Sequence, residues 1–130
     1  MILLDTHVVV WLALDQTKIS KRARFTIDQS RRQSEPLAIS DITLFELATL
    51  VSKGRVRLNI SLDSFLQEVE SRFAVLPMNG RVCSLAMALP AAYSKDPADR
   101  IIGATALVQG LSLLTADAEI RRSRALPTIW

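Results

Sequence analysis

The stretch MILLDTHVVVWL, residues 1–12, decides the fold that we expect for this chain. Residues 2–4 are apolar, as in a short strand that is covered on both faces of a parallel sheet. The spacing of Val8 and Trp11 then suits one face of a helix. Asp5 therefore lies at the carboxyl end of a strand, the edge where open α/β sheets bind ligands. The alternative is that this acid only caps the helix.

Short apolar runs alternate with helical patterns along the rest of the chain, which is typical of a parallel α/β sheet. Asp96-Pro97 predicts a helix start, because an acid caps the first turn and proline fits its first position. In the helix over 21–33 we expect Ala23, Ile27 and Phe25 to face inward. We predict one α/β domain over residues 1–130, a short parallel sheet flanked by helices. The expected further strands are 37–39, 74–76, 111–115 and 128–130, and the expected further helices are 21–33, 40 or 41 to 54, 61 or 63 to 72, 80–89, 96–110 and a short one after 117.

The composition of the chain argues against several classes of protein. The 130 residues include one cysteine, Cys83, so no disulfide can form within the chain, which fits the reducing cytoplasm. No apolar run approaches the roughly 20 residues of a membrane span. Lysine and arginine number 16 and aspartate and glutamate 13, a net charge of +3 that favours a polyanionic partner. We therefore expect a cytoplasmic protein that does not associate with a membrane.

Asp117 repeats the pattern of Asp5, because the run 113–116 delivers an acid just past a strand end. Two parallel strands would thus leave carboxylates at one edge of the sheet. Thr115 adds a hydroxyl group at the same edge. The alternative for Asp117 is again a cap, since a short helix follows it.

Glu46 lies in a helical segment that is apolar almost all round. Such a helix is usually buried, and a buried carboxylate needs a counter-charge or a metal ion. The alternative is a capping box formed by Thr43 and Glu46. That box would require the helix to begin at Thr43, whereas Ser40 and Asp41 are the better caps.

Asp96 and Asp99 stand at the cap and the third position of the helix that Pro97 begins. Both acids suit the unpaired amides of a helix start, but one of them is enough. Asp96 is the more natural cap, which leaves Asp99 for chemistry. Arg100 beside it can pair with an acid or a phosphate group.

Four acids are thus expected at one edge of the sheet, and their mutual repulsion needs compensation. Two carboxylates about 4 Å apart repel each other by roughly 4 kcal/mol at an effective dielectric constant of 20. A domain of ordinary stability tolerates this if protons are shared or a divalent cation binds. Without a cluster of histidine or cysteine, the oxygen donors favour Mg²⁺ or Mn²⁺ over zinc. Such a site can activate water for attack on a phosphodiester. The acids are Asp5, Glu46, Asp99 and Asp117.

In order and spacing, four groups of residues resemble the PIN-domain nucleases, particularly the VapC-type toxins of bacterial toxin–antitoxin pairs. The resemblance implies a PIN-like fold and a Mg²⁺ or Mn²⁺ site formed by the four acids named above. It also implies endoribonuclease activity on RNA, a homodimer, and inhibition by a cognate antitoxin that binds as a hetero-oligomer. The matching residues are LLDTH (3–7) with WL (11–12), SDITLFELA (40–48) with KG (53–54), DPADRII (96–102) and LTAD (114–117).

The chain departs from the family pattern just ahead of the Asp-Pro motif. The family often has a histidine or a further acid there, where this chain has Tyr93-Ser94-Lys95, residues 93–95. This difference leaves the role of Asp96 open. His7 recurs in part of the family, and we interpret this lone histidine as a structural or hydrogen-bonding residue rather than a metal ligand.

The predicted site also includes residues that would hold the substrate or orient a ligand. These are Thr6, Ser40, Arg100 and Thr115, and the basic group Arg121 to Arg124 would bind the RNA backbone.

Two other functions are weighed against the nuclease. A phosphatase or phosphotransferase with Asp5 as nucleophile needs a second acid soon after it, but Thr6 and His7 stand there. A PIN-like module that binds RNA or a partner without catalysis has no need to keep all four acids.

Overall fold

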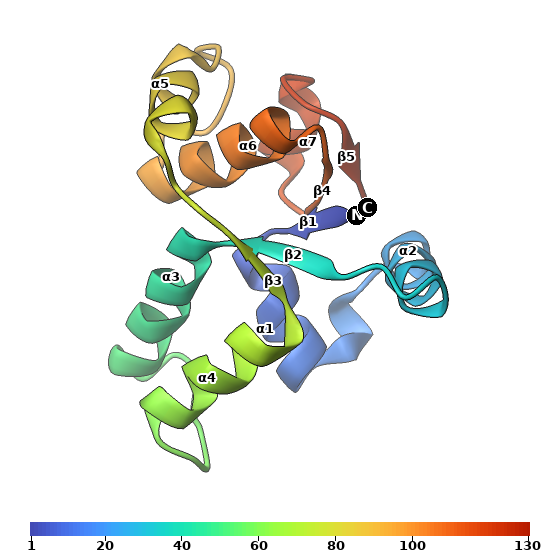
Figure 1. The fold of residues 1–130 in the computed structure, drawn as a ribbon, viewed down its shortest axis with the longest axis vertical. Helices are drawn as coiled ribbons and strands as arrows, with labels where there is room; N and C mark the ends of the chain where they lie inside the picture. The colour runs from blue at the N-terminus through green and yellow to red at the C-terminus, as the bar shows by residue number, and fades with distance from the viewer.

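A five-stranded parallel sheet forms the centre of the computed structural model, which describes residues 1–130 (Figure 1). The strand order is β3-β2-β1-β4-β5, so the opening stretch provides the middle strand. Ile2 of this strand pairs with Leu37 on one side and with Ser112 on the other. The predicted α/β class with a short parallel sheet is therefore confirmed. The strands are β1 (Ile2–Leu4), β2 (Leu37–Ser40), β3 (Ala74–Leu76), β4 (Ser112–Leu114) and β5 (Thr128–Ile129).

Helices cover both faces of the sheet, with α1 to α4 on one face and α5 to α7 on the other (Figure 1). A short 3₁₀ turn, η1, joins α1 to α2. None of the helices is both long enough and apolar enough to cross a membrane. The helices are α1 (Thr6–Leu14), η1 (Gln16–Lys18), α2 (Lys21–Arg32), α3 (Asp41–Ser52), α4 (Leu62–Arg72), α5 (Gly80–Ala88), α6 (Pro97–Gln109) and α7 (Ala118–Ser123).

The two cores follow the alternation of side chains along the strands. Ile2 and Leu4 pack with the layer of α1 to α4, whereas Leu3 between them packs with α6 and α7. Leu114 and Leu113 divide between the two layers in the same way. Because both faces of the sheet are covered, every residue of β1 is buried, which explains its continuous apolar run.

The predicted helix boundaries agree with the structure where capping residues mark them. Ser40 caps α3, and Asp96 caps α6 with Pro97 in the first turn. Gly54 has a φ of +72°, the left-handed conformation predicted for the residue that ends α3. Local backbone chemistry therefore places the helices that carry two of the four acids.

Two expectations about burial were wrong. Phe25 is 60% exposed, because α2 turns Ala23 toward the sheet and leaves the opposite side in solvent. The helix α3 is not buried all round either. Only Thr43 and Leu47 are buried in it, and Phe45 is 69% exposed. The argument for Glu46 must therefore rest on its own contacts rather than on a buried helix.

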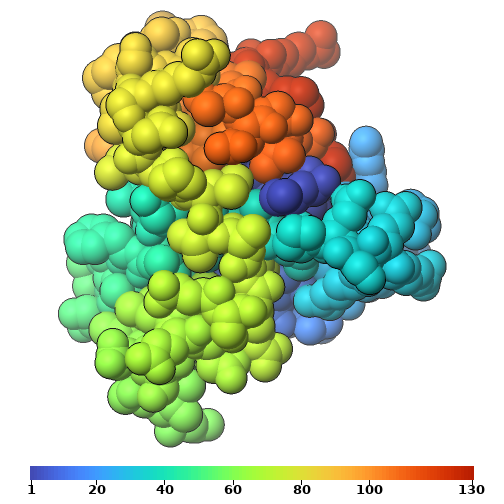
Figure 2. Space-filling model, in the orientation of Figure 1, coloured from blue at the N-terminus to red at the C-terminus, as the bar shows by residue number.

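The start of the chain lies at the molecular surface, next to the segment that leads into β2 (Figure 2). The amino group of Met1 forms an ion pair of 3.0 Å with Glu35 in that segment. This pair fastens the outer end of β1, while the other end of the strand leads into the candidate site.

Candidate active site

Asp5 lies at the carboxyl end of β1 and is held by both of its carboxylate oxygens. Oδ1 accepts a hydrogen bond of 2.9 Å from the amide of Thr6, so the acid does cap α1. Oδ2 accepts a hydrogen bond of 2.8 Å from the hydroxyl group of Thr115, which follows β4. Asp5 is only 4% exposed. Capping thus accounts for Oδ1 of Asp5. The hydrogen bond of Oδ2 with Thr115 links the carboxyl ends of β1 and β4.

Asp117 lies at the same edge, two residues beyond Thr115. Its Oδ1 accepts a hydrogen bond of 3.0 Å from the amide of Ile120 and so caps α7. Its own amide donates to the Thr115 hydroxyl oxygen at 3.1 Å. The Thr115 hydroxyl group therefore contacts both Asp5 and Asp117, and it fixes the position of one strand end relative to the other.

Glu46 approaches the edge from α3. The hydroxyl group of Thr6 donates to Glu46 Oε1 at 2.5 Å and lies 3.0 Å from the hydroxyl oxygen of Thr43. Because α3 begins at Asp41, the capping box of Thr43 and Glu46 does not form. Burial raises the pKa of the Glu46 carboxyl group, the Thr6 hydrogen bond opposes this, and the charge of Asp5 adds to the rise.

Asp99 comes from the first turn of α6. Its Oδ2 accepts a hydrogen bond of 2.7 Å from the hydroxyl group of Ser94, and its amide donates to Asp96 Oδ1 at 3.1 Å. Burial raises the pKa of Asp99 to about 6, although the Ser94 hydrogen bond opposes this; nearby carboxylates, Asp5 first among them, raise it further. Asp96 therefore acts as the cap, as predicted, and the ionised form of the Asp99 carboxyl group is disfavoured by its surroundings.

No lysine or arginine neutralises these acids. The ion pairs of the chain join Met1 to Glu35 and Arg72 to Glu68, and His7 Nδ1 lies 3.6 Å from Asp5 Oδ2. Arg100 follows Asp99 directly, but its Nη1 donates to the carbonyl oxygens of Ala86 and Leu89 at 2.9 and 3.3 Å. Arg100 therefore fastens the end of α5 against α6 through Nη1.

Three oxygens of the acids face solvent without a protein partner. Glu46 Oε2, Asp99 Oδ1 and Asp117 Oδ2 accept no hydrogen bond, and none of them is a buried unpaired atom. All are hard oxygen donors of the kind that Mg²⁺ and Mn²⁺ prefer. In this conformation no three acidic side chains converge closely enough to enclose an ion. The donor chemistry fits a divalent cation.

The comparison with known proteins identifies the family. A sequence profile of the PIN domain matches residues 2–126. The chain belongs to the PIN domain family. This PIN domain is 35% identical over 131 residues to "Ribonuclease VapC22" of Mycobacterium tuberculosis (strain ATCC 25618 / H37Rv), and the alignment covers 99% of this chain and 98% of that protein.

Solved structures confirm the PIN-like fold. VapBC2 from Rickettsia felis, bound to a DNA fragment from its promoter, is 20% identical with a TM-score of 0.74, covering 98% of this chain and 97% of that chain. FitAcB from Neisseria gonorrhoeae is 23% identical with a TM-score of 0.71, covering 98% of this chain and 96% of that one. DNA-bound VapBC from Salmonella typhimurium is 22% identical with a TM-score of 0.69, covering 98% and 97%. At these identities the likeness shows the fold alone.

Three hydroxyl groups were expected to hold the substrate or orient a ligand. Thr6 and Thr115 are buried, and their hydroxyl groups orient the carboxylates of Glu46 and Asp5. Ser40 is fully buried and caps α3.

Ser94 has a role that the sequence did not predict. It lies in the segment ahead of the Asp-Pro motif and holds the carboxylate of Asp99. A short hydroxyl side chain close to a candidate acid was the only signal available in the sequence.

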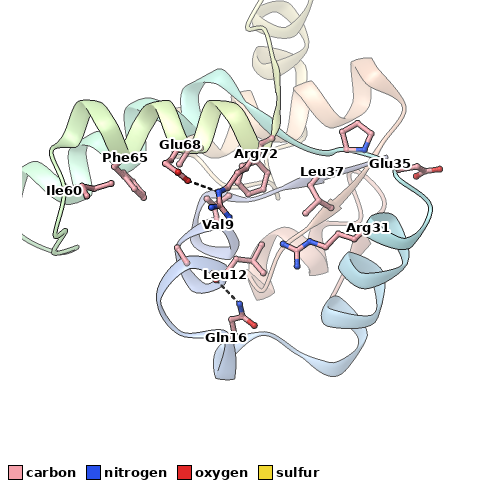
Figure 3. A pocket seen from close by; sticks show the side chains of 14 residues that line it. Val9, Leu12, Gln16, Arg31, Glu35, Leu37, Ile60, Phe65, Glu68 and Arg72 are labelled. Carbon is pink, nitrogen blue, oxygen red and sulfur yellow. Dashed lines mark hydrogen bonds and ion pairs between the residues drawn. The ribbon is translucent and has the colours of Figure 1, made fainter.

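A large hollow of the PIN domain lies away from the four acids. It is a groove of about 880 Å³ between α1, α2 and α4 (Figure 3). Apolar residues of α1 and α4, such as Leu12 and Phe65, line it. Charged side chains also border it, among them Arg31 and the ion pair of Glu68 with Arg72 at 2.8 Å (Figure 3). None of the candidate acids lines this groove, so it is a second and separate surface.

Proposed function

We propose that this PIN domain is an endoribonuclease that hydrolyses phosphodiester bonds of RNA. One observation carries the proposal: four acids from different elements occupy the carboxyl edge of the sheet, and no lysine or arginine is paired with any of them. The full-length relative from Mycobacterium tuberculosis is named a ribonuclease, which supports the same activity here. We take Asp5, Glu46, Asp99 and Asp117 as the catalytic acids.

We propose Mg²⁺, or Mn²⁺ in its place, as the cofactor held by these four acids. When bound, the cation would stabilise charge on the phosphate group and lower the pKa of the attacking water. The three solvent-facing oxygens of Glu46, Asp99 and Asp117 support this assignment. The raised pKa values of Glu46 and Asp99 also support it, because burial and neighbouring carboxylates disfavour their ionised form and a bound cation would favour it.

The residues of the chain have separate tasks in the proposed hydrolysis. A water oxygen bonds to phosphorus, the bond from phosphorus to the leaving ribose oxygen breaks, and that oxygen takes up a proton from solvent. Asp99 would hold the cation through the attacking water and accept that water's proton at Oδ1, the oxygen that Ser94 leaves free. Thr6 and Thr115 keep Glu46 and Asp5 in place during the reaction.

The RNA backbone would lie along the basic residues that follow Asp117. Arg121 and Arg122 of α7 and Arg124 just beyond it are exposed, and none of them forms an ion pair. Phosphate contacts by such residues are weakened by salt in a regular way. Affinity for RNA should therefore fall as the salt concentration rises.

We also propose that the protein is the toxin of a type II toxin–antitoxin pair, a homodimer that a cognate antitoxin inhibits. The solved complexes with the same fold include VapBC assemblies, which supports this role. The groove of Figure 3 offers an apolar floor and a charged border of suitable size for a segment of the antitoxin. We propose that residues 1–130 act as one domain in the cytoplasm, where a chain with one cysteine needs no disulfide.

Cleavage of RNA with and without a chelator tests the proposal. We expect the purified protein to cleave a mixed RNA substrate in the presence of Mg²⁺ or Mn²⁺. Addition of EDTA should abolish this cleavage. Asp5→Asn should abolish cleavage while far-ultraviolet circular dichroism shows a folded protein. A protein that binds RNA or an antitoxin but cleaves nothing in either metal would instead be a PIN-like binding module without catalysis.

A further inference from the structure

His7 connects the first turn of α1 to the loop that carries Asp117. Its Nε2 accepts a hydrogen bond of 3.0 Å from the backbone amide of Ala116, the residue just before Asp117. The two partners are 109 positions apart in the sequence. Together with the Thr115 hydroxyl group, His7 therefore holds the loop after β4 at two successive residues.

The hydrogen bond from Ala116 decides which form of the imidazole ring is present. An N–H donor requires a free lone pair on Nε2, so the ring proton of the neutral imidazole is on Nδ1. Nδ1 lies 3.6 Å from Asp5 Oδ2, a favourable electrostatic contact that is longer than a hydrogen bond. Neither nitrogen then offers a lone pair to a cation, so His7 is not placed to be a metal ligand.

Aromatic packing holds the His7 ring in this orientation. The ring stands edge-on to Trp11, one turn later in α1, with centroids 4.9 Å apart and an interplanar angle of 61°. Trp11 packs in turn on Trp130, with centroids 5.7 Å apart. The His7 side chain is 30% exposed, and its two nitrogens nevertheless face Asp5 and Ala116. The imidazole is thus fixed by neighbours that have no chemical role.

We propose that His7 is a positioning residue that sets the carboxylate of Asp117 relative to that of Asp5. It acts by accepting the hydrogen bond of the Ala116 amide, not by binding the cation or the RNA. The proposal rests on the proposed nuclease function of the same site. Residues that orient metal ligands through a hydrogen bond commonly change metal affinity or activity about 10- to 100-fold when they are replaced.

Two substitutions separate this role from a general effect on folding. In His7→Gln the side-chain amide oxygen reaches about as far as Nε2 and can accept the Ala116 hydrogen bond. In His7→Asn the side chain ends at the place of Nδ1 and cannot reach that amide. Both variants remove the ring from Trp11, so a loss of aromatic packing would affect them equally.

The first measurement needs no activity: hydrogen exchange of the Ala116 amide in the metal-free protein, followed by NMR. We expect slow exchange in wild type and in His7→Gln, and fast exchange in His7→Asn. The second measurement is RNA cleavage with Mn²⁺ titration. We expect His7→Asn to lower kcat and weaken Mn²⁺ binding by about tenfold or more, with little change in KM for RNA, and His7→Gln to retain most of both.

The outcomes distinguish the two proposals. If wild type cleaves RNA and both variants match it, or both are impaired equally, His7 is not a positioning residue. If the exchange pattern is as expected but wild type cleaves no RNA in either metal, the nuclease function fails while the contact of His7 with Ala116 stands. Thermal melts of both variants serve as the control that they are folded.

Discussion

The hydroxyl group of Thr115 donates a hydrogen bond of 2.8 Å to Asp5 Oδ2, although 110 positions separate the two residues in the sequence. The same hydroxyl oxygen accepts the amide of Asp117 at 3.1 Å. Thr115 is fully buried, so no water replaces these contacts. One small side chain thus holds two candidate acids from neighbouring strands.

Thr115→Val tests this junction, because valine keeps the shape of threonine and removes the hydroxyl group. We expect the free energy of unfolding to fall by about 1–3 kcal/mol, since a buried carboxylate oxygen and an amide lose their partner. RNA cleavage should fall as Asp5 and Asp117 lose their relative position. Urea denaturation and a cleavage assay measure the two effects. Thr115→Ser keeps the hydroxyl group and should behave like wild type; a valine variant of unchanged stability and activity would contradict this role.

The stability of the metal-free protein should depend on the ionisation of Asp99. Its pKa is about 6 in the folded protein against an ordinary value of 3.8, so the folded state holds the proton more tightly than the unfolded state. The contribution of Asp99 is therefore fully present below about pH 4 and is lost as the pH rises through about 6. Thermal melts between pH 4 and 8 should show a smaller decline in Asp99→Asn than in wild type. Mg²⁺ added at pH 8 should raise the stability of the wild-type protein again. Equal declines in both proteins would argue against a raised pKa of Asp99.

Ser94→Ala should change the pH dependence of cleavage. The Ser94 hydroxyl group favours the ionised form of Asp99, so its removal raises the pKa of that carboxyl group further. Because the base must be ionised, the acidic limb of the rate profile should move to higher pH. Lys95→Ala alters the exposed neighbouring residue and serves as the control. Profiles that coincide for wild type and Ser94→Ala would remove Asp99 as the titrating base.

Gly103→Ala should destabilise the protein, because α6 passes close to Tyr93. A Cβ atom at Gly103 would lie 2.3 Å from Oη of Tyr93, a buried side chain that donates a hydrogen bond of 3.1 Å to the Asp99 carbonyl oxygen. We expect a loss of about 1–3 kcal/mol in the free energy of unfolding from this overpacking. Gly80→Ala is the matched control in α5, where the added methyl group meets no atom within 4 Å. Equal stabilities of the two variants would show that Tyr93 moves aside freely.

Ile60→Glu should weaken binding of the antitoxin without changing cleavage of RNA by the free protein. Ile60 lines the groove of Figure 3 and is 52% exposed, so a charge there disturbs the apolar floor and not the core. Calorimetric titration with the cognate antitoxin measures the affinity. Phe25→Glu is the control, since Phe25 is 60% exposed on α2 and does not line the groove. Equal affinities of the two variants would place the antitoxin elsewhere.

The sequence by itself determined the sheet, the helix starts and the place of Asp5 and Asp117 near the ends of their strands. Each of these follows from local chemistry: the apolar run of β1, the caps Ser40 and Asp96, and an acid directly after β1 or three residues after β4. The exposure of apolar side chains on the outer sides of α2 and α3 could not be predicted in the same way. Apolar residues such as Phe25 and Phe45 remain in solvent because no neighbouring element covers them.

Only the tertiary structure decided how the opening stretch and its acid are held. Asp5 was identifiable as the acid at the end of β1, but its partner Thr115 and the contact of His7 with Ala116 join segments more than 100 positions apart. The direction of a side chain depends on rotamers that packing selects, and Arg100 points to carbonyl oxygens of α5 and the residue after it for that reason. Sequence spacing places residues on an edge, whereas contacts between distant elements determine which of them meet.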